Sequence, residues 1–356
     1  MENRSLFSSR RWLIYTEIFA IIVFIAIAAI LIQKSNSEQE LYPLSQVENL
    51  ITEADTLFAK QDFGDAILLY WQALIAMDQA KTDANAETRL HANLRIAEIY
   101  SQSSWVKDAW SRLKNASIIN PEDEQVLLLS GKLYRDLSNQ EEAANHFISV
   151  IDKNAGNAEA HYLLGVLYQG RKQYSDASFH YLEAINNDTD LKNVSSEKAP
   201  IGILARLQLS RTYNKMFQSY RFLDRELTNE DYAEMSRLES QSIILLKEAN
   251  QLYPGMQEIV NDLIGLLYYR ASALKREAAT RPYADALEVY EEIVELDPTE
   301  VQAWQEMAEI YESYLRDKEQ ALEMYQQVYK LEPHSTFLAI IKSLEEDIAT
   351  EKEQNN

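Results

Sequence analysis

The histidines, carboxylates and hydroxyls of this chain are not arranged for any familiar catalysis. The 356 residues include no cysteine, which excludes thiolate nucleophiles, thiolate metal sites and disulfides. The sequence also lacks H-E-x-x-H, G-x-S-x-G, G-x-x-x-x-G-K and G-x-G-x-x-G, the motifs of zinc peptidases, serine hydrolases and phosphate-binding loops. We therefore predict a protein that is not an enzyme, with no catalytic, cofactor-binding or metal-binding residue.

Two of the five histidines occupy equivalent positions in adjacent repeats, where they could form a metal-binding pair. His146 and His180 lie 34 residues apart, each just before a large apolar residue of the same pattern. No carboxylate lies at a metal-ligand spacing from either of them, so we expect packing rather than coordination. We expect His161 to be a packing residue as well.

The charge of the chain narrows the class of partner. The formal net charge is −22, and residues 1–34 carry +2, which leaves −24 on the rest. Such a body repels phosphate backbones, so we predict no nucleic-acid partner. Glycine (8) and proline (7) are scarce, which argues against a fold rich in β-hairpins and favours an all-α one.

The N-terminal region has the pattern of a membrane anchor. Residues 12–32 form a run of 21 residues, and from Ile18 to Ile32 no side chain is polar. That length spans about 30 Å of hydrocarbon as a helix. Arg4, Arg10 and Arg11 precede the run, so the positive-inside rule predicts a cytoplasmic N-terminus (1–11). We predict a linker at 33–45 and a body outside the cytoplasm, in the periplasm if the source is a bacterium.

A cleaved signal peptide is the alternative for the same segment. Residues 26–28 (Ala-Ile-Ala) resemble a small-residue cleavage site. Residues 29–32 continue the apolar run where a cleavage region should become polar. The uncleaved anchor is therefore the favoured interpretation.

From residue 46 onward the chain repeats itself. Ala97, Gly131 and Gly165 are 34 residues apart, each followed three positions later by tyrosine and twelve positions later by alanine. Two antiparallel helices can cross closely where one carries a small residue, so each unit is predicted to be a helix pair. Later units keep the pattern with insertions: 20 residues between Ser210 and Ser242, nine after Gly265 and one in the last unit.

This pattern resembles the tetratricopeptide repeat family over roughly residues 46–352. The resemblance implies a right-handed α-solenoid of about seven helix pairs, with repeats one to four at 46–190 and five to seven at 191–334. Residues 335–356 then form a capping helix and tail. In this family the first helix of each pair lines a concave groove that commonly holds a peptide. Membrane-anchored members look like bacterial envelope assembly factors; the cysteine-rich metal knuckle of some relatives is absent here.

The resemblance also predicts which side chains face the groove. Lys132 and Arg135 make its middle weakly basic, where the acidic part of a partner would lie. The alternative is an ordinary solvated helix face. Ile51 and Asp55 stand where the family's carboxylate clamp requires Lys and Asn, so that clamp is not expected. The predicted groove residues are Lys132, Arg135, Tyr162, Gln169, Arg211, Gln302, Gln305, Glu309 and Glu312.

The 20-residue insertion predicts a long hairpin of two helices, 202–226 and 229–252, with Thr228 as the N-cap of the second. Its apolar residues either pack against one another or form a docking knob or dimer contact at 214–234. These residues are Met216, Phe217, Tyr220, Phe222, Leu223, Tyr232, Met235 and Leu238.

Together these observations predict a non-catalytic scaffold that binds other proteins or peptide segments. It would be anchored in the cytoplasmic membrane by residues 12–32 and would assemble or stabilise an envelope complex. The alternative is an auxiliary subunit that presents substrate to an envelope enzyme for secretion, polysaccharide synthesis or cytochrome maturation.

Overall fold

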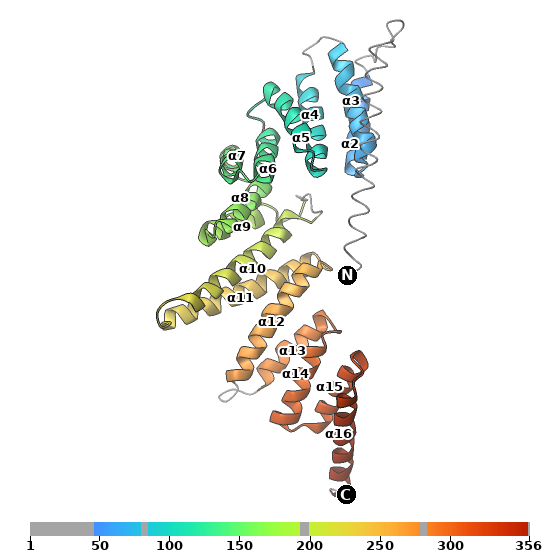
Figure 1. The fold of residues 1–356 in the computed structure, drawn as a ribbon, viewed down its shortest axis with the longest axis vertical. Helices are drawn as coiled ribbons and strands as arrows, with labels where there is room; N and C mark the ends of the chain where they lie inside the picture. Colours follow the sequence, from blue (N-terminus) through green and yellow to red (C-terminus); the bar gives the residue numbers. More distant parts are fainter. Residues whose placement is uncertain (1–45, 80–84, 193–198, 278–282, 355–356) are drawn as a thin grey trace. The chain divides into compact units, whose positions relative to one another are not determined.

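The computed structural model describes residues 46–79, 85–192, 199–277 and 283–354 (Figure 1). This part of the chain is all-helical: it holds fifteen α-helices, two short helices of other types and no β-strand. None of these helices is long and apolar enough to cross a membrane. The predicted anchor at 12–32 and the linker at 33–45 lie outside the described residues.

The helices form two compact units, Met1–Leu167 and Tyr168–Asn356, whose boundary falls near the end of helix α8 (Ala158–Gly170). In the first unit, neighbouring helices pack as successive pairs. These are α2 (Val47–Ala59) with α3 (Phe63–Gln79), α4 (Ala86–Gln102) with α5 (Val106–Ile119), and α6 (Glu124–Asp136) with α7 (Gln140–Lys153).

The second unit continues the same arrangement and ends in one unpaired helix. Its elements are α9 (Tyr174–Asn186), α10 (Ile201–Ser219) with α11 (Asn229–Leu252), α12 (Gln257–Glu277) with α13 (Ala284–Leu296), α14 (Val301–Glu309) with α15 (Lys318–Leu331), and α16 (Ser335–Gln354). Helix α16 packs on α15 through Ile341 and Leu344, in agreement with a capping role.

The turn inside each pair repeats in its backbone geometry. Ser104, Ser138 and Lys172 lie 34 residues apart and all adopt the left-handed conformation, with φ between 61° and 63°. In each turn the following residue donates its N–H to the carbonyl of the repeat tyrosine, at 2.9 Å. Such a residue closes a helix end by satisfying a free carbonyl. The 34-residue period is therefore a property of the fold as well as of the sequence.

The last repeat has one extra residue, and the structure absorbs it in a π-helical turn. Helix α14 passes into η3 (Ile310–Leu315), and Arg316 takes the left-handed position at a φ of 57°. The N–H of Asp317 then reaches the carbonyl of Tyr311 at 2.9 Å, so the turn closes as in the other pairs. An insertion of one residue into a helix commonly produces this local widening.

The small residue of the repeat does lie at a helix crossing in the third pair. Gly131 is buried on α6, and a Cβ added there would stand 2.5 Å from Cε1 of Phe147, which is itself fully buried on α7. The prediction is wrong for Gly265. That glycine is exposed, with nothing within 4 Å of an added Cβ, and the fully buried small residue of α12 is Ala271.

These two glycines make a matched pair for a stability test. We expect Gly131→Ala to lower the free energy of unfolding by about 1–3 kcal/mol, because the added methyl group must displace the fully buried ring of Phe147. We expect Gly265→Ala to raise it by about 0.5–1 kcal/mol, the usual gain of alanine over glycine inside a helix. Urea titration followed by circular dichroism measures both; equal effects of the two changes would contradict this assignment.

Candidate binding cleft

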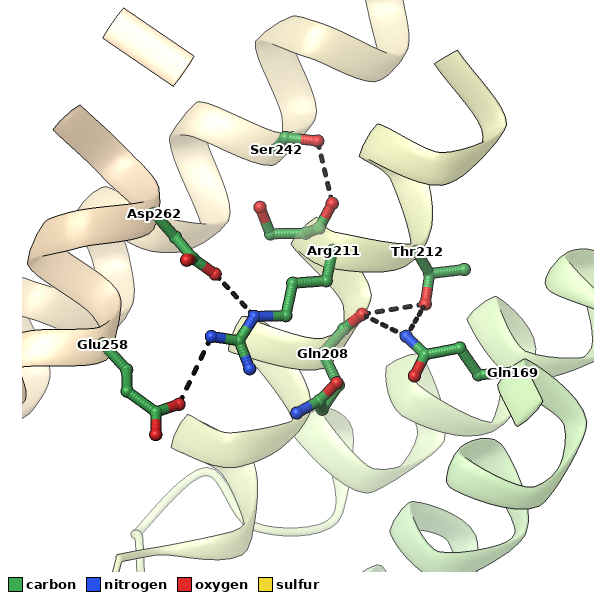
Figure 2. Close-up of polar contacts among 8 residues, drawn as sticks. Gln169, Gln208, Arg211, Thr212, Ser242, Glu258 and Asp262 are labelled. Atoms are coloured by element: carbon green, nitrogen blue, oxygen red, sulfur yellow. Dashed lines mark hydrogen bonds and ion pairs between the residues drawn. The ribbon is translucent and has the colours of Figure 1, made fainter. Parts of the chain in front are cut away.

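The long hairpin of α10 and α11 is built around a close crossing of two serines. Ser242 is fully buried, and its hydroxyl proton is shared between the carbonyl of Leu238 at 2.8 Å and that of Ser210 at 3.3 Å. Figure 2 draws a single contact from the Ser242 hydroxyl. A small side chain at this point lets the two helices approach, so that they lie side by side along their length (Figure 1).

The turn of the hairpin begins earlier than predicted. Helix α10 ends at Ser219 and a short 3-10 turn (η2) covers 220–222, so the predicted continuation to 226 is wrong. The second helix begins as predicted, because Thr228 and Asp231 form a reciprocal capping box. Arg225 also forms an ion pair with Asp231 at 2.5 Å, and this pair holds the pKa of the Asp231 carboxyl well below its usual range.

The apolar residues of the hairpin divide into two groups. Leu238 is fully buried, and Phe217 packs edge-on against Tyr269 of α12 with ring centroids 5.3 Å apart. Phe222 is 86% exposed and Leu223 and Tyr232 are also exposed, close to the turn. The inner residues therefore pack within the unit, while those near the turn stay open to solvent.

A cleft of about 590 Å³ opens between α10, α11 and α12 in the second unit. Most of its lining comes from α10 and α12, which are the first helices of their pairs, and Gln169 contributes from the end of α8. The lining residues are Gln169, Gln208, Ser210, Arg211, Asn214, Lys215, Phe217, Gln218, Arg221, Glu239, Ser242, Asn261, Asp262, Gly265, Leu266 and Tyr269. No acid, base or nucleophile of a known catalytic arrangement stands among them.

Arg211 fixes one wall of the cleft. Its Nε donates to Asp262 at 2.5 Å and its Nη2 to Glu258 at 3.3 Å, so that one α10 side chain bonds twice to α12 (Figure 2). On the α8 side, Gln169 donates to the hydroxyl of Thr212 at 2.8 Å and to the carbonyl of Gln208 at 3.3 Å. These bonds hold the walls of the cleft in register.

The charges that remain inside the cleft are positive. Its two carboxylates are neutralised, Asp262 by Arg211 and Glu239 by Arg270 at 3.1 Å. Lys215 and Arg221 also line it, and neither forms an ion pair with any residue that the structure describes. Arg221 lies over the aromatic pair, 5.4 Å from the ring centre of Tyr269 and 5.8 Å from that of Phe217.

Sequence reasoning identified Gln169 and Arg211 in this cleft but missed Lys215 and Arg221. A signal for them was present: residues 201–223 contain four basic residues and no Asp or Glu, in a chain of net charge −22. These residues form α10 and the turn after it, and α10 contributes more residues to the cleft lining than any other helix.

Four of the other predicted groove residues are bonded to neighbours within their own units. Lys132 pairs with Glu159 at 2.7 Å and Arg135 with the adjacent Asp136 at 3.1 Å, while Tyr162 is half-buried. In the second unit Glu309 pairs with Lys275 at 2.6 Å and Glu312 accepts from Tyr325 at 2.8 Å; Gln302 is exposed and Gln305 half-buried.

Asp55, which stands at the position of the family's clamp, is bonded inside the first unit. It accepts from the hydroxyl of Tyr70 at 2.5 Å and contacts Nε2 of His91 at 2.8 Å. Burial and the neighbouring carboxylate together raise the pKa of Tyr70 well above its usual value.

The two equivalent histidines stack on the repeat tyrosines. His146 lies on Tyr134 with centroids 5.3 Å apart, and His180 lies on Tyr168 at 5.4 Å. Within the described chain no group of three or more histidine, aspartate or glutamate side chains could hold a metal ion. Burial lowers the pKa of His146, because the charged imidazolium loses hydration there.

That lowered pKa predicts how stability changes with pH. A histidine with a lowered pKa in the folded state binds fewer protons than it does in the unfolded chain. Its contribution is complete above the unfolded pKa, about 6.5, and is lost as pH falls below it. We therefore expect the urea midpoint to fall more between pH 7 and 5 in the wild type than in His146→Phe. Parallel pH curves would contradict the prediction.

Comparisons with known proteins agree with this geometry. Residues 302–335 match the tetratricopeptide repeat family. A solved structure from Cytophaga hutchinsonii, the C-terminal part of a TPR repeat-containing protein, is similar with a TM-score of 0.51 and 12% identity, covering 82% of this chain and 99% of that one. No curated protein sequence matches the chain significantly.

Two further solved structures have lower similarity. A tetratricopeptide repeat protein from Parabacteroides merdae has a TM-score of 0.43 at 14% identity, over 84% of this chain and 99% of that one. Pseudomonas aeruginosa PilF has a TM-score of 0.42 at 14% identity, over 74% and 99%. Residues 302–335 thus match one tetratricopeptide repeat, and the chain as a whole shares the fold of paired helices with the Cytophaga structure.

Proposed function

We propose that this protein is a non-catalytic scaffold that binds a segment of another protein in the cleft of its second unit. The observation that supports this most is the composition of the cleft. Five primary amides line it, from Gln169, Gln208, Asn214, Gln218 and Asn261. Gln169 already donates to Thr212 and Gln208, and Gln218 donates to Asn214 at 3.3 Å. The side-chain amide of Gln208 and the N–H groups of Asn214 and Asn261 can still bond to the donors and acceptors of an extended peptide backbone.

The proposal includes a site of action at a membrane. The apolar run at 12–32 and the arginines before it support a single-pass anchor in the cytoplasmic membrane with the repeats outside the cytoplasm. On this proposal the partner is a protein of the cell envelope, and the anchor raises its effective concentration at the membrane. The acidic body supports a protein rather than a nucleic acid as the partner.

Affinity purification of the full-length protein from its native membrane, followed by mass spectrometry, tests this proposal. Two double variants are compared with the wild type. Gln208→Ala with Asn261→Ala removes two cleft amides, and Lys132→Glu with Arg135→Glu reverses the predicted basic part of the groove in the first unit.

We expect the cleft variant to lose a defined set of envelope proteins that the wild type retains. Retention of the same set by both variants would contradict binding through either surface. If the lost set contains an enzyme whose activity also falls, the protein is the substrate-presenting subunit described above rather than a structural adaptor.

A further inference from the structure

We propose that the cleft selects a partner segment in which at least two aspartate or glutamate side chains flank an aromatic or aliphatic one. This inference rests on the proposed function, because it specifies the chemistry of the segment that the same cleft binds. Three observations support it. Lys215 and Arg221 have no ion-pair partner in the described chain, the rings of Phe217 and Tyr269 lie beside Arg221, and six positions separate the two cations along α10 and the turn after it.

Several cations on the helices of the second unit are paired with carboxylates. On the helices of this unit, Arg211, Lys247, Arg270, Lys275 and Lys318 form ion pairs at 3.3 Å or less. Arg276, Lys330 and Lys342 form none with a described residue, but they lie outside the cleft. Both carboxylates of the cleft are used in this way, whereas Lys215 and Arg221 have no carboxylate partner in the described chain. The cleft is therefore complementary to added negative charge.

The charge beside the cleft differs from the charge of the chain as a whole. The chain carries −22, so an acidic partner is repelled at long range by the body as a whole. Among the described α-helices, α10 alone contains no Asp or Glu, and it lies along the cleft. An acidic segment therefore meets less repulsion beside this helix than beside the others.

The aromatic pair of the cleft favours an apolar side chain between the two carboxylates of the partner segment. Phe217 and Tyr269 meet edge-on at 5.3 Å and line the cleft together with Leu266, which offers an apolar surface to one side chain. Arg221 lies over the same pair, and a guanidinium stacked on rings still has its in-plane N–H groups available for a carboxylate.

The spacing of the two cations favours side-chain carboxylates over a single terminal one. Lys215 and Arg221 are six residues apart on α10 and the turn after it, which corresponds to about 9 Å along the helix axis. Two separate carboxylates match two sites at that distance better than one C-terminal group does. A segment of three to five residues spans it when extended.

Selection from a random peptide library displayed on phage tests the inference. The full-length protein is used as bait, beside a Lys215→Glu/Arg221→Glu variant and an Arg276→Glu/Lys342→Glu control, in which two exposed cations outside the cleft are reversed. We expect the wild type and the control to enrich peptides with Asp or Glu on both sides of an aromatic or aliphatic residue, and the cleft variant not to.

A binding measurement then completes the test. The most enriched peptide is synthesised with its acidic residues intact and with each replaced by Gln or Asn. We expect the amide version to bind the wild type at least 10-fold more weakly, the size of one charge-assisted hydrogen bond, and both versions to bind the cleft variant equally weakly. Enrichment without acidic residues, the same enrichment with all three baits, or no enriched peptide would each overturn the inference.

The outcomes also separate this inference from the proposed function. Peptides that lack acidic residues but still lose binding to Tyr269→Ala would keep the cleft as a binding site and discard its charge selectivity. Acid-rich peptides whose binding is unaffected by both the charge reversal and Tyr269→Ala would place the contact elsewhere and discard both.

Discussion

Replacing Gly265 by tryptophan is expected to abolish partner binding while leaving the helical fold intact. Gly265 lines the cleft, is exposed, and has nothing within 4 Å of an added Cβ, so an indole fits there without displacing the protein and takes up space in the cleft. Affinity for a cleft-binding peptide should fall by about 10-fold or more, since the cleft loses much of its volume. The urea midpoint should remain unchanged or rise slightly, because glycine is a poor helix former.

Gly170→Trp is the matched control. Gly170 is also exposed, also has open space around an added Cβ and lies in the same unit, but it does not line the cleft. We expect this variant to bind as the wild type does. Equal loss of binding in both tryptophan variants, or in neither, would show that the partner does not occupy the cleft.

The second large effect is expected at the crossing of α10 and α11. Ser242 is fully buried there, and leucine would place three carbon atoms where one hydroxyl oxygen now lies between two helices in contact, and would remove the hydroxyl bonds to Leu238 and Ser210. Overpacking and the loss of the hydroxyl bonds together should cost roughly 3 kcal/mol in the free energy of unfolding. Urea denaturation followed by circular dichroism measures the loss.

The same substitution at Ser236 provides the comparison. Ser236 is an exposed residue of α11, so Ser236→Leu should change the free energy of unfolding by less than about 0.5 kcal/mol. A loss at Ser236 as large as at Ser242 would mean that the serine crossing does not hold the hairpin together. Because α10 and α11 form two walls of the cleft, Ser242→Leu should also weaken peptide binding.

Much of this fold could be predicted from the sequence because one physical requirement recurs every 34 residues. A helix pair needs a small residue at its crossing, as at Gly131 against Phe147 and at Ser210 beside Ser242. The predicted helix pairs, the N-cap at Thr228 and the final packed helix are confirmed by the structure. Local chemistry determines each of these features, so that they are visible in a short stretch of sequence.

The structure differs from the prediction where a helix is longer than its counterparts in the regular 34-residue repeats. Helix α12 has 21 residues, and its buried face passes through Leu263, Leu267 and Ala271. Gly265 lies off that face, so its spacing from Tyr268 reproduces the repeat pattern without the packing. The one-residue insertion of the last repeat could be counted from the sequence, but its placement in a π-helical turn depends on the packing of α14 against α15.

The cleft could be predicted only in part, for a different reason. Gln169 and Arg211 follow from their places in the repeat, whereas the importance of Lys215 and Arg221 depends on which carboxylates are already paired. That pairing joins α10 to α12 and α12 to α11, across tens of residues, and no local pattern encodes it. The anchor at 12–32 and the predicted domain boundaries stay predictions.

Site-specific photo-crosslinking tests the central claim most directly. A photoreactive phenylalanine analogue is placed at Gln218 or Asn261, two exposed residues of the cleft, or at Glu288, an exposed residue of α13 outside it. The full-length protein is then irradiated in the cells that produce it. We predict that one partner protein crosslinks from both cleft positions and not from Glu288, and that Gly265→Trp removes the crosslink. A crosslink to the same partner from Glu288 alone, or one that persists with Gly265→Trp, would contradict binding in the cleft.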